Sequence, residues 1–406
     1  MIPILAWRNV WRSRTRSLVV ISAVAIGIWA LLFLLGFSQG MMSSYIESAI
    51  ENQTSHLQIH DKDFQKDKEV KFFMENSDAL MNTLSKNELV ENATLRSLSM
   101  GMVATAKGAR GVSIRGVNPE EEAKVSRLDT KIIEGEYLSE KGRNSIIIGK
   151  SLAEKLKTKL RKKVVLTFQD VNNNQIQAAF RVTGIYTMGS AKMDEAFVYI
   201  RNSDLNRLLG IEKGGHEIAI LTNDIDEVDL VVNNLKSETD TSKVAIEPYY
   251  VISPELNLFN EQMGASTGIL TAIIMLALIF GIINTMLMAV LERTKELGML
   301  MAIGMNKGKV FLTIVFETLL LSIIGAPLGM LLGWLTIMGT NSTGIDLTAY
   351  QKGLEQFNMS GMVHPSLTPD TYITVAFAVF LTALFASIYP ASKAVKLKPV
   401  EAMRKI

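Results

Sequence analysis

Four stretches of the chain are almost free of charge and long enough to cross a lipid bilayer. They lie at 17–46, 262–291, 310–338 and 372–388, and Glu317 is the only charged residue in them. At about 1.5 Å per helical residue, each can span a hydrocarbon layer of roughly 30 Å, the last only just. The pattern predicts a membrane protein with four transmembrane helices and excludes a wholly soluble one.

The segment 47–261, between the first two stretches, predicts a folded α+β domain because runs of period-two apolar residues alternate with runs of helical spacing. More than 200 residues is large for one core, so we expect two subdomains. One would combine 47–100 and 216–261 beside the membrane, and the other would be the inserted part 101–215. Strands are predicted at 57–59, 146–148, 164–168, 179–185, 196–200, 218–221 and 244–247, and helices at 79–90, 151–160, 204–209 and 225–235.

The distribution of charge predicts the side of the membrane on which each segment lies. Four arginines and no acidic residue precede the first stretch, and 292–309 and 390–406 are also basic on balance. The segment 47–261 holds 28 basic and 33 acidic residues, a balance of −5, in a chain with net charge +2. The positive-inside rule therefore places both termini and the loop 292–309 in the cytoplasm, and 47–261 and 339–371 outside.

Residues 1–16 predict an amphipathic helix lying in the membrane interface. Its tryptophans are four residues apart, as are three of its arginines, so indoles and guanidinium groups occupy neighbouring faces: Trp7, Trp11, Arg8, Arg12 and Arg16. An aromatic and basic flank without a separate helix fits the same residues. The apolar run at 17–46 is too long for a signal peptide, so we expect a retained first transmembrane helix that extends outward.

No arrangement of residues predicts catalysis or a metal site. Gly149-Lys150-Ser151 resembles the end of a phosphate-binding loop, but Asn144 occupies the position of its leading glycine, so a helix start capped by Ser151 is expected instead. His56 and His60 share one face of a predicted strand about 13 Å apart, where a metal would need further carboxylate ligands. Cysteine is absent, which excludes thiol nucleophiles and disulfides. The small net charge gives no indication of nucleic-acid binding.

The third stretch carries a row of glycines and the intramembrane carboxylate. Gly325, Gly329 and Gly333 recur every four residues, which permits close helix packing either within a subunit or between subunits. Glu317 lies near the predicted cytoplasmic side. A carboxylate at such a depth is typical of a functional or bundle-facing position. We expect it to reach the interface or to pair with a basic neighbour, ahead of a role in proton coupling.

Residues 292–305 give the strongest functional signal. As a helix, this segment places its two glutamates on one face and an apolar stripe on the opposite face: Leu297, Leu300, Met301 and Gly304. A structure of this size has no core of its own. The segment is therefore predicted to dock into another protein.

The segment from Glu292 to Gly304 reads E-R-x-x-E-x-G-x-L-x-A-x-G. This pattern closely resembles the loop by which permeases of the MacB, FtsX and LolC/LolE group of ABC transporters contact their ATPase. The segment 317–325 is similar to the family's E-x-x-L-L-x-x-x-G, and the tail 389–404 to its closing P-A-x-x-A…P-x-E-A-L-R. Three segments of the large domain resemble the lipoprotein-releasing LolC/LolE branch: 114–117, 147–153 and 182–185.

Two features depart from this family's patterns. MacB itself carries a fused ATPase domain, which these residues do not include. The hairpin that holds a carrier-binding hook in LolC would fall at 169–177, which is short and polar here. The second departure weakens any expectation that this subunit hands cargo to a carrier.

The resemblance implies a non-catalytic permease subunit of the bacterial inner membrane. ATP and Mg would be bound by a separate cytoplasmic ATPase, and two ATPases would pair with two permeases, identical or not. The residues expected to contact the ATPase are Glu292, Arg293, Glu296, Leu297, Gly298, Leu300, Ala302 and Gly304. Charge reversal in Glu296→Lys is expected to abolish co-purification with the ATPase or stimulation of its turnover.

The resemblance also implies the cargo, an acylated lipoprotein taken from the outer leaflet between the first and second spans. Apolar residues of these spans would bury its acyl chains: Ile28, Leu32, Leu35, Ile269, Ile273 and Leu276. Two alternatives remain open. A permease like FtsX would regulate a periplasmic cell-wall hydrolase, and one like MacB would export drugs or peptides.

Overall fold

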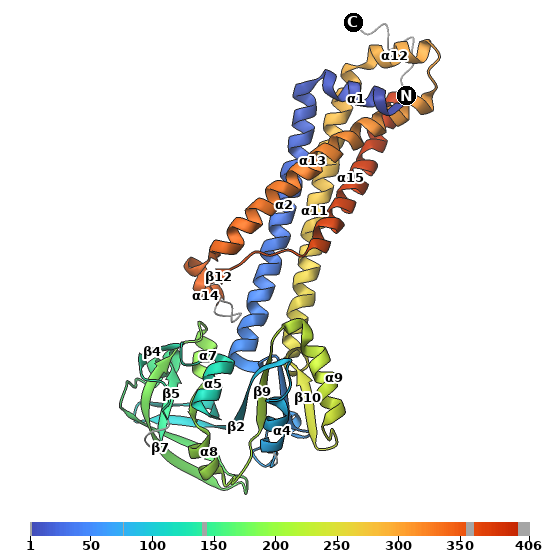
Figure 1. Ribbon diagram of the computed structural model, residues 1–406. Coiled ribbons are helices and arrows are strands. Elements are labelled where there is room, and N and C mark those ends of the chain that lie inside the picture. The colour runs from blue at the N-terminus through green and yellow to red at the C-terminus, as the bar shows by residue number, and fades with distance from the viewer. Residues whose placement is uncertain (1, 76, 140–143, 355–360, 397–406) are drawn as a thin grey trace. The chain divides into compact units, whose positions relative to one another are not determined.

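The computed structural model describes residues 2–75, 77–139, 144–354 and 361–396 (Figure 1). The tail motif at 397–404 lies outside the described residues. The chain divides into two compact units. One is helical and contains 1–42, 260–346 and 362–406, and the other is an α+β domain that contains 43–259 together with 347–361.

Four helices of the described residues are long and apolar enough to cross a membrane, as predicted. The first continues as a π-helix, η1 (Ile50–Thr54), beyond the predicted end of the apolar stretch at residue 46. These helices, separated by the large domain after the first, confirm the predicted fold class. The four are α2 (Arg14–Ala49), α11 (Pro254–Glu292), α13 (Lys307–Thr343) and α15 (Pro369–Val395).

The glycine row of α13 packs against α2 of the same chain. A Cβ atom added at Gly329 would lie 2.5 Å from the carbonyl oxygen of Ala25, and one at Gly333 would lie 2.7 Å from Leu32 Cδ1. The absence of side chains therefore lets the two helices approach to backbone contact. Of the two arrangements that the sequence left open, the structure contains packing within the subunit.

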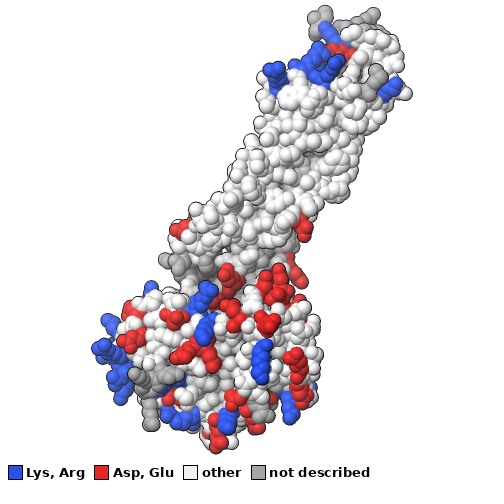
Figure 2. Space-filling view, in the orientation of Figure 1, with Lys and Arg blue, Asp and Glu red and all other residues white. Residues whose placement is uncertain are grey.

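One end of the helical unit carries two short helices and most of its basic residues (Figures 1 and 2). These helices are α1 (Ile2–Arg12) and α12 (Thr294–Ala302). In α1, Ala6 and Val10 are buried, whereas Trp7 and Trp11 are about half exposed with their rings 5.8 Å apart. The first residues thus form a separate helix rather than an unstructured flank.

Ten strands of the described residues form one sheet in the α+β domain, and nine of them follow the order β10-β1-β9-β2-β3-β8-β5-β7-β4. The tenth strand, β6, pairs with both β2 and β7, so the second half of the sheet closes into a barrel. A two-stranded pair, β11 (Ile345–Asp346) and β12 (Met362–Val363), joins α13 to α15. The ten strands are β1 (Leu57–Asp61), β2 (Val90–Thr105), β3 (Gly108–Val117), β4 (Ile132–Gly135), β5 (Ser145–Gly149), β6 (Lys163–Gln169), β7 (Gln175–Tyr186), β8 (Phe197–Arg201), β9 (Glu217–Thr222) and β10 (Val244–Pro248).

The long strand β2 belongs to both subdomains. Its first half pairs with β9, and from Ser97 onward it pairs with β3. One core lies between β1, β9, β10 and the helices α4 and α9, and a second fills the barrel. The shorter helices of this domain are α3 (Phe64–Asp67), α4 (Ser77–Leu84), α5 (Pro119–Ser126), α6 (Lys150–Lys155), α7 (Ala191–Ala196), α8 (Asn202–Leu209), η2 (Ile225–Glu227), α9 (Val228–Glu238), α10 (Tyr249–Ile252), η3 (Thr348–Tyr350) and α14 (Gln351–Leu354).

The predicted capping role of Ser151 is wrong. Helix α6 begins at Lys150, and the residue that caps it is Gly149, which makes no side-chain capping bond. A Cβ atom at Gly149 would lie 2.1 Å from the carbonyl oxygen of Asp194, so this position needs glycine for close backbone packing. The Gly-Lys-Ser sequence is thus explained by the packing of α6 against α7.

The histidines are held by protein partners. His60 in β1 lies 3.1 Å from Glu247, and His56 lies 2.8 Å from the hydroxyl of Thr222. His216 is fully buried; its Nε2 lies 2.9 Å from the carbonyl of Val70, and burial lowers its pKa to about 4. Among the described residues, no three His, Asp or Glu side chains are grouped as metal ligands would be.

Candidate functional site

Helix α12 forms most of the loop that was predicted to contact an ATPase. Arg293 separates it from α11, and Gly304, with φ of +100°, ends it in a conformation that other residues rarely adopt. The side chain of Asn306 then accepts a hydrogen bond from the amide of Gly308 at 3.1 Å and caps α13. The loop therefore has a defined start and end.

The apolar residues of α12 divide between the fold and the surface. Leu297 and Met301 pack against the core of the transmembrane helices. Met299, Leu300 and Ile303 are 52%, 36% and 79% exposed. The exposed apolar patch therefore differs from the predicted stripe, because two members of the stripe are used within the chain.

The charged residues of the loop bind other parts of the helical unit. Arg12 of α1 forms a two-pronged ion pair with Glu296, at 2.7 and 3.0 Å. Arg293 lies 3.8 Å from Glu296 and also donates to Glu317 of α13 at 3.0 Å. This network joins α1, α12 and α13 at one end of the helical unit.

Glu317 is buried and has two partners. Besides the bond from Arg293, it accepts a hydrogen bond from the side-chain amide of Asn9 at 2.5 Å. The prediction that this carboxylate pairs with a basic neighbour is confirmed. The basic N-terminal segment of the sequence signalled a cationic surface, but nothing in its spacing identified Asn9 as a partner.

The remaining predicted contact residues lie in the same loop. Glu292 is exposed at the end of α11, 3.7 Å from Arg16 of α2. Gly298 is buried within α12, whereas Ala302 and Gly304 are exposed near its end. The structure thus brings the eight residues together in one short segment, although they do not share one surface.

The residues predicted to line a cargo cleft fall into two groups. Ile28 and Leu32 are fully buried against α13, and Leu35 is partly buried beside the same core. The residues from α11 are 53–63% exposed: Ile269, Ile273 and Leu276. Of the predicted residues, only those of α11 could line an open cleft in this structure, because those of α2 pack into the core of the transmembrane helices.

The first and second spans contact each other directly. The hydroxyls of Ser38 and Thr267 lie 2.9 Å apart, and a Cβ atom at Gly27 would lie 2.4 Å from Leu278 Cδ2. On the face of α2 that points away from the other helices, Ile26 is 58% exposed. Separation of α2 from α11 is thus required before a bulky apolar group can pass between them at these positions.

Comparison with known proteins identifies the family. The profile of the MacB-like periplasmic core domain matches residues 17–238, and that of the FtsX-like permease C-terminal domain matches 268–399. The chain belongs to the MacB/FtsX family of ABC transporter permeases. As a member of this family, it is a multi-pass membrane protein of a class whose members work with ATPase partners.

Two relatives align with nearly all of this permease, and a third aligns with part of it. A LolC lipoprotein-releasing system transmembrane protein from Neisseria meningitidis serogroup B is 23% identical, over 96% of this chain and 94% of the relative. An uncharacterized ABC transporter permease from Methanocaldococcus jannaschii is 22% identical, over 98% and 96%. A macrolide export ATP-binding/permease protein MacB from Chlorobaculum tepidum is 34% identical over 30% of this chain and 16% of the relative.

Among solved structures, the permease is similar to the periplasmic region of MacB from Actinobacillus actinomycetemcomitans. That comparison has a TM-score of 0.37 and 17% sequence identity, and it covers 52% of this chain and 97% of the other.

Proposed function

We propose that this permease receives mechanical work from a separate cytoplasmic ATPase through α12 and uses it outside the membrane. The observation that carries this proposal is the exposed apolar patch of Met299, Leu300 and Ile303 on a short helix that is itself anchored to the transmembrane core. Within the described part of the chain this patch is left uncovered, and it would suit a groove on another protein. ATP and Mg would be bound by the ATPase, not by this chain.

The surrounding ion pairs support transmission of a push on α12. The loop is tied to α1 through Arg12 and to α13 through Arg293, so a displacement of α12 would be passed to both helices. The basic residues gathered at this end support a cytoplasmic position for both termini and for α12, in a bacterial inner membrane (Figure 2). By analogy with the family, two permeases, identical or not, would assemble with two ATPases.

For the cargo, we propose a lipoprotein extracted from the outer leaflet of that membrane. The relatives named LolC support this choice, because one of them aligns over almost its whole length. The exposed apolar side chains of α11 would receive the acyl chains at about 25 cal/mol per Å² of buried surface. Export of drugs or peptides in the manner of MacB, and control of a periplasmic hydrolase in the manner of FtsX, are the competing outcomes.

Reconstitution distinguishes these functions. The permease and its cognate ATPase would be placed in liposomes with an acylated lipoprotein, and release into the soluble fraction would be measured with a periplasmic carrier present. We expect release that requires ATP hydrolysis. Retention of the lipoprotein, together with ATP-dependent activation of a cell-wall hydrolase or transport of a macrolide, would refute the cargo assignment while leaving the coupling mechanism intact.

Replacing Ile303 with aspartate tests the docking surface. Because this side chain is 79% exposed, the change costs the isolated permease little stability, but burying a carboxylate in an apolar interface is unfavourable. We expect at least a tenfold loss of affinity for the ATPase, measured by co-purification at graded concentrations. Ile4→Asp, an equally apolar exposed position on α1, serves as the control and should bind normally.

Charge exchange between Arg12 and Glu296 tests transmission through α1. Glu296→Lys alone places two cations together and is expected to abolish ATPase stimulation, as the sequence predicted. The double variant Arg12→Glu/Glu296→Lys restores an ion pair of reversed polarity and should recover most of the stimulation. Since exposed ion pairs add only about 0–1 kcal/mol, neither variant should unfold the protein. A double variant no more active than Glu296→Lys would indicate that Glu296 contacts the ATPase itself.

A further inference from the structure

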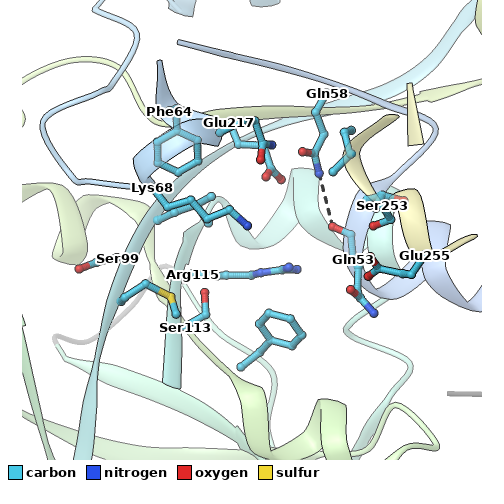
Figure 3. A pocket seen from close by; sticks show the side chains of 16 residues that line it. Gln53, Gln58, Phe64, Lys68, Ser99, Ser113, Arg115, Glu217, Ser253 and Glu255 are labelled. Atoms are coloured by element: carbon cyan, nitrogen blue, oxygen red, sulfur yellow. Dashed lines mark hydrogen bonds between the residues drawn. The ribbon is translucent and has the colours of Figure 1, made fainter. Parts of the chain in front are cut away.

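The α+β domain contains a pocket of about 360 Å³ (Figure 3). Its walls come from both subdomains and from the residues that join this domain to the first and second spans. Gln53 and Thr54 belong to the π-helical end of the first span, and Ser253 and Glu255 lie at the start of α11. The volume falls within the range of small-molecule sites. None of its lining residues belongs to the loop 292–309 or to the residues predicted to line the cargo cleft.

Arg115 of β3 brings a buried positive charge to this pocket. Its side chain is 8% exposed, and its guanidinium lies 4.0 Å from the centre of the Phe197 ring. Nη1 donates two long hydrogen bonds, to the carbonyl of Asn52 at 3.3 Å and to the hydroxyl of Tyr199 at 3.4 Å. Within the described part of the chain, Arg115 forms no ion pair, so its Nε and Nη2 groups are available to an anion.

A second cation shares this space. Lys68, which follows α3 in a left-handed conformation, extends its ammonium group into the pocket beside Arg115 (Figure 3). No ion pair to it exists among the residues that the structure describes. Two carboxylates also line the pocket. That of Glu217 is engaged by Arg96 at 2.8 Å, and that of Glu255 belongs to an exposed residue at the start of α11. The two cations therefore favour a negatively charged group between them.

The pocket also has buried polar atoms that lack partners. The Oε1 atom of Gln58 and the hydroxyl of Ser99 make no hydrogen bond within the described residues, although the two side chains are 2% and 3% exposed. Gln58 Nε2 donates to the carbonyl of Gln53 at 3.5 Å, which identifies Oε1 as the free acceptor (Figure 3). Buried acceptors without partners are unfavourable, so a bound group with a donor would satisfy this one.

We propose that this pocket binds a small amphipathic carboxylate that also carries an N–H donor, the chemistry of a short peptide with a free C-terminus. The carboxylate binds Arg115 and Lys68, and an amide N–H donates to Gln58 Oε1. The apolar side chain packs against the rings of Phe64 and Phe197. This inference goes beyond the proposed function and does not depend on it. The occupant would touch the ends of both helices that lead to the membrane.

Calorimetric titration of the full-length protein in detergent micelles tests the proposal with the dipeptide glycyl-phenylalanine. We expect it to bind at least tenfold more tightly than its C-terminal amide, which lacks the negative charge. Gln58→Met should weaken binding at least tenfold while leaving Tm unchanged or raised, because the change removes an unpartnered buried oxygen. A residue that served only the fold would lower Tm instead.

Two lysines of the same short segment provide a matched pair of variants. Lys68→Gln should weaken binding several-fold, whereas Lys66→Gln, at an exposed position outside the pocket lining, should have no effect. The proposal is overturned by absence of dipeptide binding at millimolar concentration, by equal affinity for the amide, or by normal binding in Gln58→Met. Inorganic sulfate, an anion without a donor, would refute the requirement for a donor if it bound as tightly as the dipeptide.

Discussion

Replacing Arg96 with methionine is expected to lower the free energy of unfolding of the α+β domain by about 3–5 kcal/mol. Arg96 is 2% exposed, and it binds both oxygens of Glu122 at 2.8 Å and one oxygen of Glu217 at 2.8 Å. Without the guanidinium, two buried carboxylates would lose their counter-charge. Urea denaturation of the full-length protein, followed by pulse proteolysis of this domain, would measure the change.

The expected loss has a structural consequence because Arg96 joins the two subdomains. Glu122 belongs to α5 beside the barrel, and Glu217 belongs to β9 of the other core. Arg110→Met, at an exposed position on the neighbouring strand β3, is the control and should change stability by less than about 0.5 kcal/mol. An Arg96→Met protein as stable as this control would contradict the role assigned to the ion pairs.

The pH dependence of stability should change sign in the same variant. Burial alone would raise the pKa of Glu122, but the Arg96 guanidinium holds it below the ordinary value. In the natural protein this stabilisation is present above the unfolded-state pKa and is lost as pH falls through the folded-state pKa. In Arg96→Met, burial without the cation should raise the carboxylate pKa, so stability should increase as the pH falls.

The transmembrane architecture and much of the sheet were predictable because their signals are local. Charge-free stretches predicted the four spans, and each strand predicted from period-two alternation overlaps an observed strand. The long strand β2 was missed, and its first residue was assigned to a helix. Its pattern is interrupted by buried polar residues such as Arg96, whose partners lie 26 and 121 residues away. Alternation cannot reveal a polar residue that distant partners satisfy.

The candidate site was predictable as a segment but not as a surface. The sequence located the loop and its helical form, yet the partner of Glu296 is Arg12, 284 residues away. The positions of Ile28 and Leu32 could not be predicted for the same reason, because they too depend on contacts between distant parts of the sequence. Their apolar character is equally suited to a lipid-facing wall and to the interior, and the choice depends on which helix meets the glycines of α13.

Replacing Gly329 with leucine is expected to abolish the native packing of α2 against α13. Even a single added carbon would meet the Ala25 carbonyl oxygen at 2.5 Å and Ile28 Cβ at 2.9 Å. Backbone atoms cannot move aside as a flexible side chain can, so the cost should reach or exceed the upper end of the usual 1–3 kcal/mol for overpacking. We expect a marked fall in the yield of folded protein and in Tm, measured in detergent by thermal unfolding.

Gly339→Leu provides a control in the same helix, because this glycine is exposed and has no atom within 4 Å of an added Cβ. It makes the same change in composition and hydrophobicity and should leave Tm nearly unchanged. The pair also separates packing within the subunit from packing between subunits. If Gly329→Leu kept a normal Tm but failed to form oligomers, the glycine face would contact another subunit rather than α2, and the helix pairing described above would be refuted.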